Sequence, residues 1–184
     1  MSVPEPPSAV SQLPTQPVVI VDYDDTWPEM FEAEKTRILE ACGEWLVDIE
    51  HIGSTSVPGL AAKPIIDMMP GLRRLEDGKH CVEPMQELGY QYLGEYGIPE
   101  RLYFNKGVPR THHVHMFVVG HDQWNRHLLF RDYLRNNPEA LAAYADLKRE
   151  LAERYRDDRD AYTDAKTQFV RAIEARARGK PSLM

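Results

Sequence analysis

The 184-residue chain contains two cysteines, Cys42 and Cys81, and it lacks any apolar run near the roughly 20 residues of a membrane-spanning helix. Two cysteines supply neither a disulfide framework nor a cysteine-based metal motif. Each lies in a helical pattern, so we expect buried free thiols. The N-terminus also lacks the basic and then apolar pattern of a signal peptide. We therefore expect a cytoplasmic protein without membrane contact.

The chain has no excess of positive charge. Its 22 Lys and Arg residues are outnumbered by 29 Asp and Glu residues, which gives a formal net charge of -7. An extended nucleic-acid interface needs a basic face, so this balance argues against one, whereas a local basic pocket is compatible with it. A hydrophobic fraction of 42% and a charged fraction of 28% are ordinary for a globular domain. No sequence feature specifies an oligomeric state.

The patterns along the chain predict an α/β protein after a proline-rich start. Residues 1–17 hold five prolines among small polar residues and predict a flexible tail. Alternating and β-branched runs then predict strands, and helical periodicity with glycine or proline boundaries predicts helices. In chain order we expect a strand at 18–21, a helix at 28–42, strands at 46–52 and 65–69, a helix at 75–88, short strands at 90–93 and 102–105, a hairpin turn at 106–110 and a strand at 112–119.

After Gly120 the pattern predicts only helices, at 122–135, 138–155 and 159–178. Because hairpin-length links join some of the strands, we interpret residues 18–120 as an α/β core with a mixed or largely antiparallel sheet. Residues 121–178 are then a C-terminal helical segment of the same domain, packed on that core. Residues 179–184 are expected to form a second tail.

The most informative segment reads HIGSTSVPGLAAKPIID, from His51 to Asp67. The second strand carries one charge, Asp67, and an acid in an apolar strand is costly unless it is paired, hydrogen-bonded or bound to a metal. The first strand ends in a turn of small residues, whose N–H groups and hydroxyls can bind an anion. The turn and the strand acid together predict a phosphate and metal site, and the turn consists of Gly53, Ser54, Thr55 and Ser56.

Two side chains flank this turn. His51 lies on the strand that leads into it, where it can contact a phosphate, act as an acid–base group, or be a satisfied half-buried histidine. Lys63 lies between the turn and Asp67, beside Pro64, and can reach a bound phosphate or remain an exposed loop lysine. For each residue the functional roles and the purely structural alternative stay open.

Asp67 and Met69 share one face of their strand, where a two-metal phosphoryl-transfer site usually has two carboxylates. The second carboxylate is absent here. His113 and His115 share a face of the strand at 112–119. If that strand neighbours Asp67, the three side chains could hold a divalent ion such as Mg, Mn or Zn, and imidazole favours Mn or Zn over Mg. The alternative is a pair of hydrogen-bonded histidines that line a cleft.

Each of the three C-terminal helices carries a cation within its apolar stripe. These residues are Arg131, Lys148 and Lys166, at positions where steps of three and four residues place an apolar side chain. A buried lysine without a partner is destabilising, so one anion facing all three helices would account for the pattern. Carboxylates of the α/β core are alternative partners. The long side chains can also reach solvent at the edge of the stripe.

A glycine-serine turn followed by an acid on the next strand resembles the nucleotidyltransferase fold of the polymerase-beta type. More closely, the chain resembles the GrpB family of nucleotidyltransferase-like proteins. A domain similar to this family also occurs fused to dephospho-coenzyme A kinase in some bacteria. The resemblance covers most of residues 18–174 and lies in five blocks: Glu50–Asp67, His112–His115, His127–Arg135, Tyr144–Leu151 and Tyr162–Lys166.

The resemblance implies a nucleotidyltransferase-like mixed sheet with flanking helices, followed by packed C-terminal helices. It also implies a phosphate-binding role for Gly53 and Ser54 and a metal-binding role for Asp67. Met69 stands where the family pattern has a second acid, and His113 or His115 replaces the third. These departures weaken the case for magnesium-dependent nucleotidyl transfer. Helices after this fold often contact a nucleotide triphosphate, which supports an anion role for the lysines of the C-terminal helices.

We therefore expect a protein that binds a nucleotide or another phosphorylated small molecule and transfers a nucleotidyl group to a small acceptor with a divalent metal. The alternatives are a catalytically inactive nucleotide-binding or partner-stabilising domain, and a metal-dependent hydrolase that uses Asp67, His113 and His115. In the leading hypothesis the anion is held by Gly53, Ser54, Thr55, Ser56, Lys63, Arg131, Lys148 and Lys166, the metal by Asp67, His113 and His115, and catalysis uses Asp67 and His51.

Overall fold

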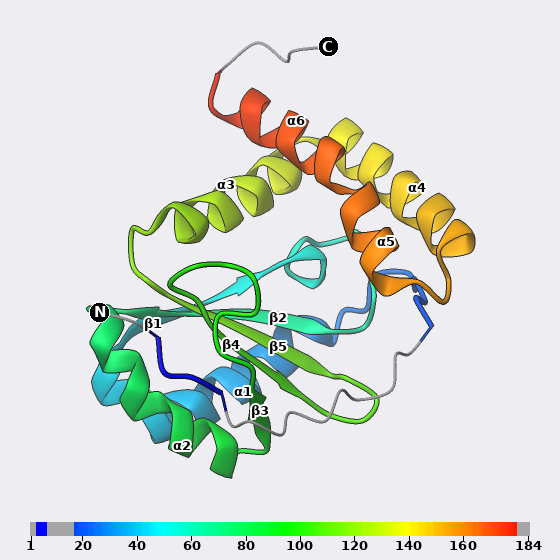
Figure 1. Ribbon diagram of the computed structural model, residues 1–184. Coiled ribbons are helices and arrows are strands. Elements are labelled where there is room, and N and C mark those ends of the chain that lie inside the picture. The colour runs from blue at the N-terminus through cyan, green and yellow to red at the C-terminus, as the bar shows by residue number, and fades with distance from the viewer. Residues whose placement is uncertain (1–2, 7–16, 180–184) are drawn as a thin grey trace.

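The computed structural model describes residues 3–6 and 17–179 and contains a five-stranded sheet with helices on both faces (Figure 1). Strands β2 and β5 run parallel, and the other neighbouring pairs are antiparallel, so the expected mixed α/β architecture is confirmed. The sheet order is β1-β2-β5-β4-β3. The strands are β1 (Leu46–Ile52), β2 (Ile66–Leu72), β3 (Tyr90–Tyr92), β4 (Leu102–Lys106) and β5 (His112–Val118).

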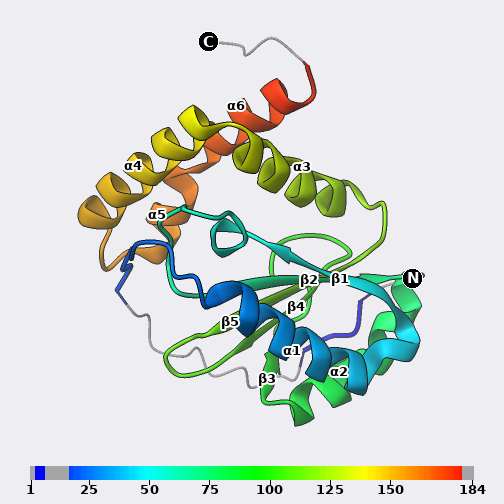
Figure 2. The same cartoon turned by 180° about the vertical axis from the view of Figure 1, so that it is seen from behind.

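The helices form two layers that sandwich the sheet (Figure 1, Figure 2). One face is covered by α1 (Trp27–Cys42) and α2 (Lys79–Glu87). The other is covered by α3 (Asp122–Asn136), α4 (Pro138–Arg154), α5 (Arg159–Ala165) and α6 (Thr167–Ala177). Successive side chains of a strand point to opposite faces. Met68 and Val114 therefore join the main hydrophobic core with α1 and α2, whereas Asp67 and His113 face the other helices.

Two strand predictions need correction. The segment 18–21 is not a strand: Val21 forms only an isolated bridge with Ala62, and the Val18 N–H donates to the Arg156 carbonyl at 2.7 Å. Strand β2 continues past the predicted end through Pro70 to Leu72. Its register with β5 skips Met69 and Pro70, and Pro70 has no N–H to donate.

The helix predicted at 159–178 is two helices, α5 and α6, which meet at Lys166. The Lys166 N–H donates to the Thr163 carbonyl, three residues back instead of four. No proline or glycine marks this break, so periodicity alone predicts one helix. The helix predicted at 75–88 likewise begins as a 3-10 turn. The 3-10 turns among residues 3–6 and 17–179 are Gly43–Trp45, Ser54–Ser56 and Leu75–Gly78.

Part of the expected N-terminal tail packs against the sheet. Val3 is 8% exposed within the main core, and the Tyr92 hydroxyl donates to the Pro4 carbonyl at 2.7 Å. The rest of the two predicted tails, residues 1–2, 7–16 and 180–184, lies outside the described residues. No helix in the described part of the chain has both the length and the apolarity to cross a bilayer.

A buried carboxylate ties α1 to the far edge of the sheet. Glu34 of α1 is 5% exposed and accepts a hydrogen bond from the Tyr90 hydroxyl at 3.0 Å. It also forms ion pairs with Lys106 at 2.7 Å and with Arg37 at 3.1 Å. Burial alone would raise the pKa of Glu34, but these partners outweigh burial and hold the pKa below its ordinary value. The network therefore stabilises the face of the sheet opposite to Asp67.

We expect Glu34→Ala to lower the free energy of unfolding by about 3 kcal/mol, because Lys106 and the Tyr90 hydroxyl lose their partner. Urea unfolding measures the change. Glu32→Ala, at an exposed position of the same helix, is the matched control. Equal stability of the two variants would contradict this account of the network.

Candidate phosphate and metal site

A pocket of about 500 Å³ opens between the sheet and helices α3–α6. Two of its lining side chains are carboxylates, Asp67 and Asp160. Six are cationic, and within the described residues none of the six lies within 4 Å of a carboxylate oxygen. The cationic groups of the pocket therefore outnumber its carboxylates and form no ion pair with them. The cationic side chains are Lys63, Arg101, Arg110, Lys148, Arg159 and Lys166.

Gly53 brings the turn after β1 directly against Asp67. Its φ of 69° favours glycine, and a Cβ at this position would clash with the Asp67 carboxylate. Ser54 lines the pocket beside it. The Ser56 hydroxyl instead donates to the Gly53 carbonyl at 2.6 Å and holds the turn closed. The hydroxyl of Thr55, which also lines the pocket, donates to the Ile65 carbonyl at 3.3 Å.

Asp67 faces two histidines of β5. The parallel register places Asp67 beside His113, and His115 lies two residues further along the same face, so the two strands are neighbours as the metal hypothesis requires. His113 Nδ1 is 3.1 Å from Asp67 Oδ1, and His115 Nε2 is 3.7 Å from the same oxygen. One ligand atom from each residue lies within 4.8 Å of the others. This is a donor set that can hold a metal ion.

The donor set fits one ion rather than two. Met69 occupies the position on β2 where a second carboxylate is expected, and it is fully buried in a cluster with Ile52, Phe117 and Trp124. A two-metal arrangement therefore does not fit these residues. Two imidazoles and one carboxylate suit zinc or manganese better than magnesium.

Burial and hydrogen bonding shift the pKa values of Asp67, His113 and His127. Burial alone would raise the pKa of Asp67, but the hydrogen bonds from His113 and His115 outweigh it and hold this pKa well below its ordinary value. Burial lowers the pKa of His113 despite the neighbouring carboxylate. Burial also lowers the pKa of His127, which lines the pocket, to about 3.

Three lysines in the pocket have pKa values below the ordinary value of lysine. Burial lowers the pKa of Lys148 to about 6, of Lys63 to about 7 and of Lys166 to about 8. Cationic neighbours also lower each of these pKa values, whereas Asp67 raises those of Lys63 and Lys166. Lys148 is 2% exposed, and its Nζ donates to the Ala61 carbonyl. Lys63 and Lys166 both lie over the Tyr162 ring, at 5.2 Å and 4.2 Å from its centroid. An anion in the pocket would favour the charged form of all three.

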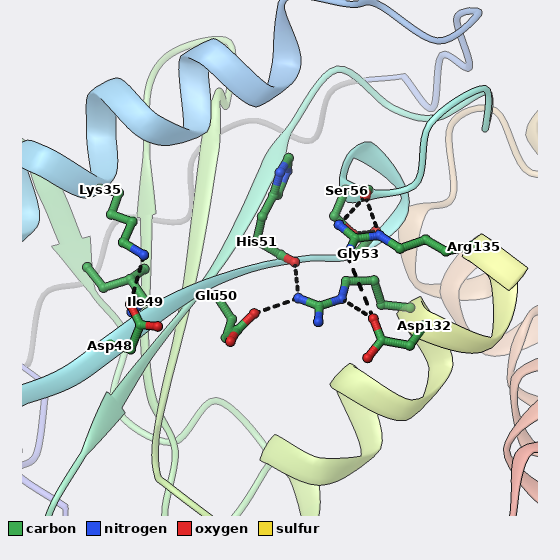
Figure 3. A network of polar contacts seen from close by, with 10 residues as sticks. Lys35, Asp48, Ile49, Glu50, His51, Gly53, Ser56, Asp132 and Arg135 are labelled. Carbon is green, nitrogen blue, oxygen red and sulfur yellow. Dashed lines mark hydrogen bonds and ion pairs between the residues drawn. The ribbon is translucent and has the colours of Figure 1, made fainter.

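His51 does not reach this pocket. Its ring points toward α1 (Figure 3) and stacks on Phe31 with 4.6 Å between ring centroids. Its Nε2 lies 3.0 Å from the Thr55 hydroxyl, and burial lowers its pKa to about 4. His51 pairs with Met68 across the sheet, on the face opposite to Asp67. This placement corrects the predicted catalytic position: His51 is the satisfied histidine that was the alternative.

Arg131 does not line the pocket either, because it joins α3 to β1. Its guanidinium lies 2.6 Å from Glu50 and 2.7 Å from Asp132, and it donates to the His51 carbonyl at 3.0 Å. Figure 3 shows this network with Arg135, which donates to the Ser56 carbonyl at 2.7 Å. Carboxylates, the alternative partners left open by the sequence, thus take the place of a ligand anion at Arg131.

The sequence interpretation missed three arginines of the pocket, Arg101, Arg110 and Arg159. Arg101 is 5% exposed just before β4, and Arg110 lies in the hairpin turn before β5, where arginine is ordinarily solvent-exposed. No local pattern identifies these two. A signal existed for Arg159, which precedes Lys166 by two helical turns on the same face.

Comparisons with known proteins match nearly the whole chain. The sequence pattern of the family described as GrpB protein matches residues 17–176. The UPF0157 protein YqkA of Bacillus subtilis is 43% identical over 166 residues, which are 90% of this chain and 48% of that protein. The crystal structure of conserved protein GrpB from Enterococcus faecalis superimposes with a TM-score of 0.82 at 40% identity, over 86% of this chain and 96% of that one.

A more distant match is a dephospho-CoA kinase of Mycolicibacterium paratuberculosis. It is 29% identical over 192 residues, which are 90% of this chain and 47% of the kinase. The chain thus spans about half the length of the kinase and of the Bacillus subtilis protein.

The pocket lysines determine how stability depends on pH. The pKa of Lys148 is about 6 in the folded chain and near its ordinary 10.5 when unfolded. Between these values the unfolded chain binds more protons, so the free energy of unfolding rises with pH. We expect Lys148→Met to reduce that slope by up to about 1.4 kcal/mol per pH unit. The variant should be at least as stable as the parent at pH 7, because no carboxylate loses its partner.

Urea unfolding at pH 7, 8 and 9 measures both effects. Lys79→Met, at an exposed position of α2, is the matched control and should keep the parental slope. A Lys148→Met protein that is less stable at pH 7 and has an unchanged slope would rule out this reading of Lys148.

Proposed function

This chain belongs to the GrpB family, within the nucleotidyltransferase-like superfamily, and from that premise we propose that its pocket binds a nucleotide or another phosphorylated small molecule. The observation that carries the proposal is the group of six cationic side chains without carboxylate partners around Asp67. Phosphate groups bring several negative charges and many acceptor oxygens, which is the chemistry that lysine and arginine donors recognise.

The phosphate oxygens would lie between the turn and the C-terminal helices. Ser54 supplies a hydroxyl from the turn, and Lys63, Lys148 and Lys166 supply ammonium groups whose charged form the ligand favours. Because α3–α6 contribute to the lining as much as the sheet does, we also propose that residues 18–120 and 121–178 act as one domain.

We further propose that Asp67, His113 and His115 hold one divalent ion, zinc or manganese in preference to magnesium. Such an ion, when bound, polarises a phosphoryl oxygen. The arginines and lysines of the pocket would stabilise negative charge as it develops on a leaving pyrophosphate. Transfer of a nucleotidyl group to a small acceptor is the reaction that this arrangement and the superfamily support.

Binding without turnover is the second candidate function. The burial of Met69 in an apolar cluster favours it, because the carboxylate for a second ion is missing from β2. The cationic pocket would then hold a nucleotide or phosphorylated metabolite without reaction. Release of pyrophosphate from a bound nucleoside triphosphate, tested across small acceptors, separates the two functions: release supports transfer, and binding without release supports this candidate.

We expect phosphorylated ligands to stabilise the protein against unfolding. A ligand at about one hundred times its dissociation constant should add about 2.7 kcal/mol to the free energy of unfolding. Inorganic tripolyphosphate and a panel of nucleoside triphosphates, each with and without Zn²⁺ or Mn²⁺, are the probes.

Lys166→Met should weaken tripolyphosphate binding by about tenfold or more, because a charged donor to the anion is removed. Lys79→Met on the outside of α2 should leave it unchanged. Absence of stabilisation by every phosphorylated probe would refute the proposed function.

A further inference from the structure

The outer nitrogens of the two candidate metal ligands face arginines. Arg159 Nη2 lies 3.4 Å from His113 Nε2, and Arg101 Nη1 lies 3.2 Å from His115 Nδ1. A guanidinium can donate hydrogen bonds but cannot accept them. Each of these ring nitrogens is therefore the acceptor and carries no proton.

A neutral imidazole has one proton, which must then sit on the other ring nitrogen. The proton of His113 is on Nδ1 and that of His115 is on Nε2, and these atoms face Asp67 at 3.1 Å and 3.7 Å. They are the atoms whose lone pairs a metal would need. Histidines that ligate metals usually donate the outer N–H to a carboxylate or carbonyl, so the outer partners here are of the opposite kind.

We propose that Arg101 and Arg159 hold the two histidines in tautomers that exclude a metal ion, and that an anion in the pocket releases them by accepting the arginine N–H groups. The inference rests on the proposed anion binding in the same pocket. Each ring stays neutral throughout. When a metal binds, the proton on the nitrogen facing Asp67 leaves to water, and the nitrogen freed by the arginine takes a proton from water.

The two arginines differ in how firmly they are held. Arg101 is 5% exposed, donates to the carbonyls of Glu95 and Tyr96 at 3.1 Å and 2.6 Å, and lies over the Tyr103 ring at 4.6 Å. Arg159 begins α5 and is half-buried, and within the described residues its guanidinium forms its one hydrogen bond with His113. An anion should therefore displace Arg159 from His113 more readily than it displaces Arg101 from His115.

These arginine–histidine contacts would couple binding of the anion to binding of the metal. An anion that engages Arg159 makes His113 available to a metal, and by linkage a bound metal favours the anion to the same extent. The pocket would then take up its metal together with the phosphorylated ligand rather than before it.

Nuclear magnetic resonance of the ring nitrogens tests the proposed tautomers directly. The protein is labelled with ¹⁵N-histidine and kept free of metal and anions at pH 8. We expect His113 as the Nδ1–H tautomer and His115 as the Nε2–H tautomer. His113→Ala and His115→Ala assign the signals. A His113 ring that carries its proton on Nε2 would overturn the proposal.

Calorimetric titration with Zn²⁺, with and without sulfate at constant ionic strength, tests the coupling. Sulfate is the probe because it carries the phosphate-like charge and binds zinc weakly. We expect saturating sulfate to tighten zinc binding by about tenfold, within the range of roughly 5- to 150-fold that is typical of coupled sites.

Arg159→Gln should tighten zinc binding in the absence of sulfate by a similar factor and remove most of the sulfate effect. Arg110→Gln removes the same charge from the same pocket, but Arg110 forms no hydrogen bond to a histidine in the described residues. Arg110→Gln should therefore weaken sulfate binding but change zinc affinity without sulfate much less than Arg159→Gln does, and saturating sulfate should still tighten its zinc binding. Removal of the zinc signal by His113→Ala shows that the titration reports this site.

The outcomes separate this inference from the proposed function. Sulfate and tripolyphosphate that fail to stabilise the protein would refute anion binding and, with it, the release step. If sulfate binds but zinc affinity stays constant, and Arg159→Gln and Arg110→Gln have the same zinc affinity, the proposed control of the histidine tautomers is refuted and anion binding is not.

Discussion

An excess of unpaired cationic side chains over carboxylates in one pocket is the constraint on which the site depends. The chain as a whole is acidic, with a net charge of -7, yet six cationic side chains gather in one pocket without carboxylate partners in the described residues. Burial of Lys63, Lys148 and Lys166 opposes their charged forms, and each is surrounded by further cations. Folding tolerates this arrangement at a cost in stability, and an anionic ligand is the partner that would remove the cost.

The sheet separates the main hydrophobic core on one face from the polar pocket on the other. The register of β1, β2 and β5 puts Met68 and Val114 in the main core and Asp67 and His113 in the pocket. A shift of one residue would exchange the two sets. Gly53 adds a second requirement, because the turn can approach Asp67 closely only where a Cβ is absent. Fold and site are therefore specified by the same alternation.

Much of this could be predicted from the sequence, because local patterns determine it. A turn of small residues followed by an acid on the next strand predicted the approach of Gly53 and Ser54 to Asp67. Cations within apolar helical stripes predicted that Lys148 and Lys166 face a common site. Arg131 satisfied the same pattern but pairs with Glu50, 81 residues away in the chain, which no local pattern reveals. Arg101 and Arg110 come from segments whose path only the tertiary fold defines. The break at Lys166 involves neither glycine nor proline, so periodicity gave no sign of it.

The central claim is that the pocket takes an anion and becomes charged as it does so. Calorimetry of sulfate binding at pH 8, repeated in buffers with different ionisation enthalpies, measures the protons exchanged on binding, and sulfate itself does not titrate at this pH. Because the pKa values of Lys148 and Lys63 lie at about 6 and 7 in the empty protein, we predict net uptake of about one proton or more for each sulfate bound. Binding without proton uptake, or with proton release, would contradict the account.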